Sequence, residues 1–338
     1  MQSLSEFFSD HFLNVEQRKF SYDFIESFLS REVNSWDVAM NTERVLGKFQ
    51  AELKRLDSSQ FAFLVCHSGY IPEKYLPDSS QETIYSKLIE AVVQEWAMRI
   101  GFSKTALRTQ KSSKEDVTIS DGQHIIVCDA KSFRLGRSQG APNVKDVLKH
   151  ADISKWLSAY PVSKRVGGLV TFPSQHDWKT GSDFYQYTTD YRLPTMCLYY
   201  EHMAFMLVAN IGSEKLLQVF SQYQTIFPNV ILKTESNRDI YYRKILDALF
   251  GDVQADFRNF SNLAGLISAE CALHTYDTLH SQIEATKRGI TEKYQRILDI
   301  EQMRRIAIEV EHAKETEDLA KQMERITKFR TVLPKYFE

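Results

Sequence analysis

The chain has 338 residues, of which 43% are hydrophobic and 25% are charged, and its formal net charge at pH 7 is −2. This composition indicates a globular protein with a sizeable core, and no apolar run is long enough to span a bilayer. The four cysteines lie far apart without a CxxC pair, which argues against a zinc site and a disulfide framework. The first residues lack a basic segment followed by an apolar one, so we expect no membrane association and a cytoplasmic protein.

A net charge near zero is not typical of a nucleic-acid-binding protein, but the charge of this chain is segregated. Residues 99–114 carry five basic side chains and no acidic one, and residues 131–149 carry five basic side chains against one acidic one. Such segments suit contact with phosphates, although a solvated protein surface has the same composition.

Residues 1–75 are predicted to be helical, because apolar pairs recur there at helical spacing. Asn41-Thr42-Glu43 indicates the start of a helix over about 43–56, and this region carries no catalytic pattern. Proline-containing turns follow at 70–78. Ser79 or Ser80 then caps a helix that runs to about Ile100. Glu90 lies on the apolar stripe of that helix, where it could support metal ligands from behind, although most helical glutamates are exposed.

Two short apolar runs, 117–119 and 124–127, flank a Ser-Asp-Gly-Gln turn and predict a β-hairpin. We expect Ile119 to pair with about His124, and therefore Asp116 to pair with about Val127. Asp129 and Lys131 follow the second strand with their side chains on one face. The hairpin thus brings Asp116 to the same end of the sheet as Asp129 and Lys131.

Two carboxylates and a lysine at the end of an apolar strand are costly to bury unless they have a function. One such function is metal-assisted hydrolysis, in which carboxylates hold a divalent cation and the lysine stabilises charge or orients a water molecule. A surface hairpin with a salt bridge is the alternative interpretation of the same pattern.

The segment 135–142 is predicted to be a partly basic loop, and a helix starts at Asn143 or Asp146 and reaches about Leu157. The amide of Asn143 could read an adenine in the major groove or merely cap the helix. Strands are predicted at 166–172 and 196–200, a helix follows to about 209, and further helices cover 213–225 and 238–250.

From about 257 to 330 the pattern predicts long antiparallel helices or a helix that packs against a partner, with Gly289 at a kink or a boundary. The fold class is therefore α/β (α+β), a mixed β-sheet flanked by helices, with helical N- and C-terminal extensions. We divide the chain into a helical region at 1–75, a core at 76–250 with a segment for DNA recognition at 135–149, and a helical region at 251–338.

The run Asp129-Ala130-Lys131-Ser132-Phe133-Arg134-Leu135-Gly136-Arg137 resembles the active-site strand and following loop of the HindIII family of type II restriction endonucleases. These enzymes belong to the PD-(D/E)xK nuclease superfamily. The likeness extends to Gly69–Glu73, Ser79–Glu82, Tyr85–Lys87, Asp116-Val117, Trp156, Tyr200–His202 and Glu292–Tyr294, and it covers about residues 62–330.

The resemblance implies that Asp116, Asp129 and the Ala130 carbonyl hold Mg²⁺ and that Lys131 orients or deprotonates the attacking water. The proline that usually precedes the first acid is replaced by Glu115, so either Glu115 or Asp116 could be that ligand. Glu115 is then, like Glu90, a candidate for supporting the ligands from behind. We expect DNA contacts from Ser132, Arg134, Arg137, Asn143, Lys145 and Lys149.

The resemblance further implies a homodimer that cuts double-stranded DNA at a short palindrome, for which AAGCTT is a candidate, in defence against foreign DNA. A DNA methyltransferase is the expected partner of such a system, but not a physical subunit. The alternatives are a nuclease of other specificity or of a repair role, and a DNA-binding module without cleavage. The presence of all three catalytic residue types favours the enzyme.

Overall fold

The computed structural model of the chain describes residues 15–33, 36, 41–108, 114–135, 144–174, 183–189, 193–229, 232, 236–295 and 301–327. Within these ranges, none of the helices combines the length and the apolar character needed to cross a bilayer. Phe7-Phe8 and Phe12-Leu13, part of the predicted N-terminal helical pattern, lie outside the described residues.

The N-terminal region is helical, as predicted, up to a short strand. Its elements and the following helix are α2 (Val15–Tyr22), α3 (Phe24–Glu32), α4 (Thr42–Leu53), α5 (Ser58–His67), β1 (Tyr70–Ile71) and α6 (Ser80–Arg99). Both predicted caps are present, because the Asn41 side chain accepts a hydrogen bond from the Arg44 amide and Ser79 accepts one from the Glu82 amide. The strand β1 was not predicted, since its two residues carry no strand pattern.

A five-stranded mixed sheet has the order β2-β3-β4-β6-β7. The strands are β2 (Ala106–Leu107), β3 (Val117–Ser120), β4 (Ile125–Ala130), β6 (Arg165–Phe172) and β7 (Thr195–Tyr199). The pairs β2–β3 and β3–β4 are antiparallel, and β4–β6 and β6–β7 are parallel. A separate parallel pair joins β1 to β5 (Phe133–Arg134). The predicted α+β class with a mixed sheet is confirmed.

The predicted register of the hairpin was wrong by two residues. Ile119 pairs with Ile126 rather than with His124, and Val117 pairs with Cys128. The four-residue loop lies at 121–124 rather than at 120–123, because Asp121 closes it by accepting hydrogen bonds from the amides of Gln123 (2.8 Å) and His124 (2.7 Å). A shift of two residues preserves the alternation of faces, so the predicted convergence at the strand end survives.

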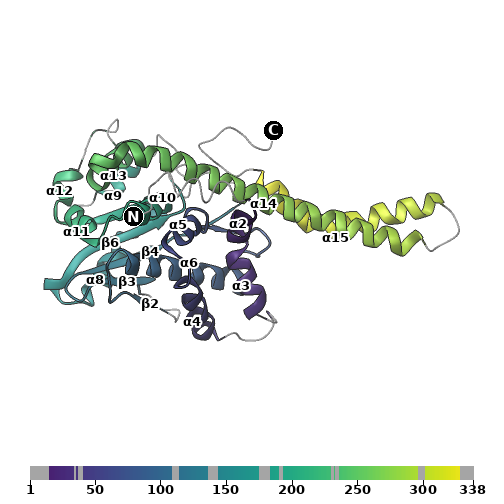
Figure 1. Cartoon of the computed structure of the whole chain (residues 1–338), viewed down its shortest axis with the longest axis horizontal. Coiled ribbons are helices and arrows are strands. Elements are labelled where there is room, and N and C mark those ends of the chain that lie inside the picture. Colours follow the sequence, from purple (N-terminus) through teal and green to yellow (C-terminus); the bar gives the residue numbers. More distant parts are fainter. Residues whose placement is uncertain are drawn as a thin grey trace.

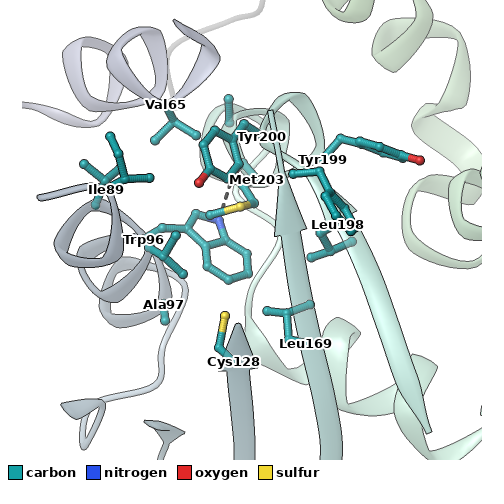
Figure 2. Close-up of a cluster of buried hydrophobic side chains, with 14 of the residues drawn as sticks. Val65, Ile89, Trp96, Ala97, Cys128, Leu169, Leu198, Tyr199, Tyr200 and Met203 are labelled. Atoms are coloured by element: carbon teal, nitrogen blue, oxygen red, sulfur yellow. Dashed lines mark hydrogen bonds between the residues drawn. The ribbon is translucent and has the colours of Figure 1, made fainter. Parts of the chain in front are cut away.

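Helix α6 covers one face of the sheet. Its Trp96 is fully buried and donates a hydrogen bond of 3.0 Å from the indole nitrogen to the carbonyl of Met203. Figure 2 shows Trp96 packed beside Cys128 and Leu169, which project from neighbouring strands. This packing helps to fix α6, and hence Glu90, over strands β2, β3 and β4 of the sheet.

The opposite face of the sheet is covered by α8 (His150–Ser158), among other helices. Close approach is possible because Gly168 has no side chain: a Cβ there would lie 2.4 Å from Cγ2 of Ile153. The helix predicted from Asn143 or Asp146 to Leu157 is in fact two helices, α7 (Val144–Val147) and α8. The interruption changes the helical phase, because Ala151 would continue the buried stripe of α7 but is exposed, while Ile153 is buried.

The remaining helices of the core follow the predicted order. They are η1 (Val162–Lys164), α9 (Phe184–Thr188), α10 (Tyr200–Val208), α11 (Ser213–Ser221), α12 (Tyr223–Ile226), α13 (Arg238–Phe250) and η4 (Gly251–Val253). The single helix predicted at 213–225 is divided into α11 and α12.

Two long helices complete the described chain, α14 (Gln254–Gln295) and α15 (Glu301–Ile326). They pack against each other, and Figure 1 shows that this helical hairpin extends well beyond the body of the molecule. Gly289 lies inside α14, so it does not mark a helix boundary. One continuous apolar cluster runs from Tyr22 to Ile267 and includes residues of all three predicted regions. The division of the chain into three regions, with boundaries at 75 and 250, stays a prediction.

Candidate active site

The end of β4 carries a buried acid next to a lysine. The apolar residues Ile126–Cys128 of β4 are fully buried between β3 and β6. The pairing of β4 with β6 continues through Asp129 and Ala130. Asp129 is 4% exposed, and its Oδ1 lies 2.7 Å from Nζ of Lys131. Its Oδ2 is buried and has no hydrogen-bond donor among the described residues. An oxygen of this kind is costly unless a cation or a donor approaches it.

Asp116, at the start of β3, reaches the same strand end. Its amide donates to the Cys128 carbonyl, and its Oδ2 accepts a hydrogen bond from the Ala130 amide, each at 3.0 Å. Burial and then the negative charge of Asp129 raise the pKa of Asp116 to about 6. The structure therefore brings Asp116, Asp129 and Lys131 together, as the sequence predicted.

Glu90 approaches this group from α6. The side chain is buried, and its Oε2 accepts a hydrogen bond of 2.6 Å from Nζ of Lys87. Burial raises the pKa of Glu90 to about 8, with a further contribution from the negative charge of Asp116. Negative charge is thus concentrated here, and Lys87 is a basic neighbour that the sequence reasoning missed. Its position one helical turn before Glu90 was the available signal.

Glu115 belongs to a different set of contacts. Its Oε1 accepts hydrogen bonds from Thr118 Oγ1 at 2.6 Å, from Arg108 Nη2 at 3.1 Å and from the Tyr160 hydroxyl. Burial opposes ionisation of the carboxyl, but the hydrogen bonds from Thr118 and Tyr160 hold its pKa below the usual range. Of the two adjacent acids, Asp116 is the one that contacts the end of β4.

The backbone of Lys131 is held on both sides. Its amide donates to the Thr171 carbonyl, and its carbonyl accepts from the Tyr200 hydroxyl, each at 3.0 Å. The Tyr200 ring packs on Gly69, where a Cβ would lie 2.6 Å from the ring. The contribution of Tyr200 was not predicted, and its place in the Tyr-Glu-His match to the family was the only signal.

The donor set fits a hard divalent cation. Two close carboxylates concentrate negative charge that a cation would neutralise, and one of them has a buried oxygen for which the described ranges supply no donor. Among the residues that the structure describes, no three or more His, Cys, Asp and Glu side chains form a complete metal-binding group. Mg²⁺ commonly binds to only one or two protein carboxylates and completes its shell with water and phosphate oxygens, so the two findings agree.

The residues predicted to contact DNA have different surroundings. The hydroxyls of Ser132 and Ser86 lie 3.4 Å apart. Arg134 donates to the Tyr75 carbonyl at 2.6 Å, so it has a role within the chain, and its contact with DNA stays a prediction. Lys149 is exposed and directly precedes α8. Lys145 lies in α7 without a described side chain, and Arg137 and Asn143 lie outside the described residues.

The comparisons with known proteins agree with this geometry. Residues 30–260, more than half of the chain, match the family model described as HindIII restriction endonuclease. The chain is also 25% identical over 154 residues to the type II restriction enzyme HindIII of Haemophilus influenzae (strain ATCC 51907 / DSM 11121 / KW20 / Rd). That match covers 45% of this chain and 48% of the relative, so the chain spans about half the length of the curated relative it matches.

Proposed function

Since the chain belongs to the HindIII restriction endonuclease family, we propose that it is a type II restriction endonuclease that hydrolyses double-stranded DNA with Mg²⁺ at a short palindrome. The observation that carries this proposal is the buried Asp129 carboxylate. One oxygen contacts Lys131, the other has no donor within the described part of the chain, and a second acid, Asp116, lies at the same strand end. A merely structural salt bridge would not require this second acid.

The proposed ligands of Mg²⁺ are Asp116, Asp129 and the Ala130 carbonyl. When bound, Mg²⁺ supplies positive charge that offsets the charge of the carboxylates and of the phosphate under attack. The Ala130 amide fixes the Asp116 carboxylate through a 3.0 Å hydrogen bond, so the ligand is oriented before DNA binds.

Lys131 is proposed to act on the attacking water. Its ammonium donates to the water oxygen and holds it, while Asp129 fixes the ammonium at 2.7 Å. The water oxygen forms a bond to phosphorus and gives up a proton to bulk water, while the bond from phosphorus to one sugar oxygen breaks and that oxygen takes up a proton from bulk water. Lys87 offsets the negative charge of Asp116, and Glu90 holds the Lys87 ammonium by a hydrogen bond.

DNA recognition is assigned to the segment 135–149, which begins directly after β5. In this proposal Lys149 contacts phosphates, and Asn143 reads a base or caps α7. A palindrome presents the same bases twice about a two-fold axis, so a homodimer with one subunit per half-site is the matching assembly. A DNA methyltransferase of the same specificity would protect the host DNA.

The experiment is incubation of the purified protein with plasmid DNA and Mg²⁺, followed by sequencing of the ends. Fixed ends within one palindrome support the proposal, and ends at AAGCTT would assign the candidate palindrome. Random ends would indicate a nuclease of a different role. DNA binding without cleavage would indicate a binding module.

A further inference from the structure

The segment that follows Lys131 is held by β1 and not by the main sheet. The Phe133 amide donates to the Gly69 carbonyl and the Leu135 amide donates to the Ile71 carbonyl, each at 3.0 Å. Residues 133–135 thus form a bridge that joins Lys131 to the segment 135–149 that we assign to DNA recognition. A displacement of β1 would therefore also displace this bridge.

Glu73, two residues after β1, joins this bridge to the helical hairpin. Its side chain is 1% exposed, and its Oε2 lies 3.0 Å from Nε of Arg325 on α15 and 3.6 Å from Nη1 of Arg134 on β5. Arg134 is fixed further by Glu82, whose Oε1 lies 3.3 Å from its Nε. One buried carboxylate thus lies between two guanidinium groups from distant parts of the chain.

An apolar contact surrounds this ionic one. A small cluster separate from the main core joins the bridge to both helices of the hairpin. Its buried members are Tyr70, Leu135, Ala272, Leu279 and Ile326, and Phe133, Tyr276, Leu319 and Met323 pack against them. We call this cluster the hairpin base. The α14–α15 hairpin therefore contacts β1 and β5 in two ways, through the buried apolar side chains of the hairpin base and through the ion pairs of Glu73.

We propose that Glu73 is a positioning residue, which acts through Arg134 and Arg325 to fix the bridge and thereby the Lys131 ammonium. The inference rests on the proposed nuclease function. In this inference the hairpin base helps to position the active site, although the hairpin itself extends away from the sheet (Figure 1).

The carboxylate charge is what this role requires. Glu73 is almost fully excluded from water, so its charge is balanced by the two guanidinium groups. Replacement by glutamine keeps the shape but leaves two cations facing each other, which pushes Arg134 away from Arg325. Because catalytic groups must be held within a fraction of an ångström, a small shift of the bridge is expected to slow chemistry more than binding.

The test compares Glu73→Gln with Glu95→Gln, a matched control. Glu95 is also a buried glutamate of an ion pair, with its Oε1 2.8 Å from Nε of Arg99, but it lies at the far end of α6. We expect Glu73→Gln to lower the single-turnover cleavage rate about 10- to 100-fold while DNA affinity in Ca²⁺ stays within about twofold. Glu95→Gln should leave both unchanged.

A second pair of variants separates positioning from loss of fold. Arg325 is 38% exposed, so Arg325→Ala should fold, slow cleavage and accelerate hydrogen exchange at the Phe133 and Leu135 amides. Arg325→Lys, which keeps the charge, should restore most of the rate. If the wild type cleaves DNA and the Glu73 and Arg325 variants cleave it at the same rate, the positioning role of Glu73 is overturned and the proposed function is not. Unchanged hydrogen exchange at the Phe133 and Leu135 amides in Arg325→Ala would overturn the positioning role in the same way. A wild type inert on all DNA overturns the proposed function and this role together.

Discussion

The Ala130 amide donates a hydrogen bond of 3.0 Å to Oδ2 of Asp116, which ties the start of β3 to the end of β4. Ala130 lies between Asp129 and Lys131, so the same contact orders all three groups of the candidate site. The amide also accounts for the orientation of Asp116, because burial near Asp129 would otherwise drive its carboxylate outward.

The two adjacent acids should respond in opposite ways to neutralisation. Asp116 has a raised pKa of about 6, so it favours the folded state when protonated, and this stabilisation is lost as pH rises from about 4 through 6. At pH 8 without metal, Asp116→Asn should therefore raise the free energy of unfolding by about 1–2 kcal/mol and abolish cleavage. Urea unfolding and a plasmid assay measure the two effects.

Glu115→Gln is the counterpart, because Glu115 is held by Arg108, Thr118 and Tyr160. It should lower the free energy of unfolding by about 2–4 kcal/mol and retain cleavage where the protein is folded. A dead Glu115→Gln beside an active Asp116→Asn would show that Glu115 is the first metal ligand.

The divalent cation should be required for cleavage but replaceable for binding. Ca²⁺ accepts oxygen ligands at longer distances and in looser geometry than Mg²⁺, so it should support DNA binding without hydrolysis. EDTA should abolish cleavage. Thermal unfolding should shift upward with Mg²⁺ in the wild type and not in Asp129→Asn. Full activity in EDTA would contradict the metal-dependent mechanism.

Gly69→Ala should damage the site at a distance. The added Cβ would lie 2.6 Å from the buried Tyr200 ring, and Tyr200 holds the Lys131 carbonyl. We expect a loss of about 1–3 kcal/mol in unfolding free energy, the usual cost of overpacking, and slower cleavage. Gly47→Ala is the matched control, because nothing lies within 4 Å of its Cβ and alanine is favoured in a helix. Equal behaviour of the two variants would refute the role of Tyr200.

Acid should destabilise the fold through His202. Burial lowers its pKa to about 3 from a usual value near 6.5, so its contribution is complete above pH 6.5 and is lost as pH falls toward 3. Below pH 6.5, His202→Gln should reduce the slope of unfolding free energy with pH by about 1.4 kcal/mol per unit. The buried acids Glu90 and Asp116 act in the opposite sense in both proteins, so the difference isolates His202. The exposed His280→Gln should leave the slope unchanged.

The sequence predicted those parts of the fold that depend on local patterns. Ser79 and Asn41 cap their helices because their side-chain oxygens satisfy free amides, and the apolar runs of β4 and β6 are buried strands. Asp116 and Asp129 meet because a hairpin error of two residues does not change the face. These features need only neighbouring residues.

The features that were missed depend on distant contacts. The pairing of β1 with β5 involves two residues on each side and has no apolar pattern of its own. The Glu73–Arg325 contact joins the first and last parts of the chain, so no local spacing could indicate it. The split between α7 and α8 lies at residues 148–149, and α8 then packs Ile153 against Gly168, which is again a tertiary contact.

The central claim, that Lys131 and Asp129 perform chemistry and not only structure, is tested by single-turnover cleavage of plasmid DNA in Mg²⁺. Lys131→Ala and Asp129→Asn should each slow cleavage about a thousandfold or more, while thermal unfolding stays within a few degrees of wild type. Lys164→Ala, whose lysine donates to the Gly122 carbonyl at 2.8 Å, is the control and should cleave normally. Cleavage near the wild-type rate by Lys131→Ala or Asp129→Asn would contradict the assignment of the site.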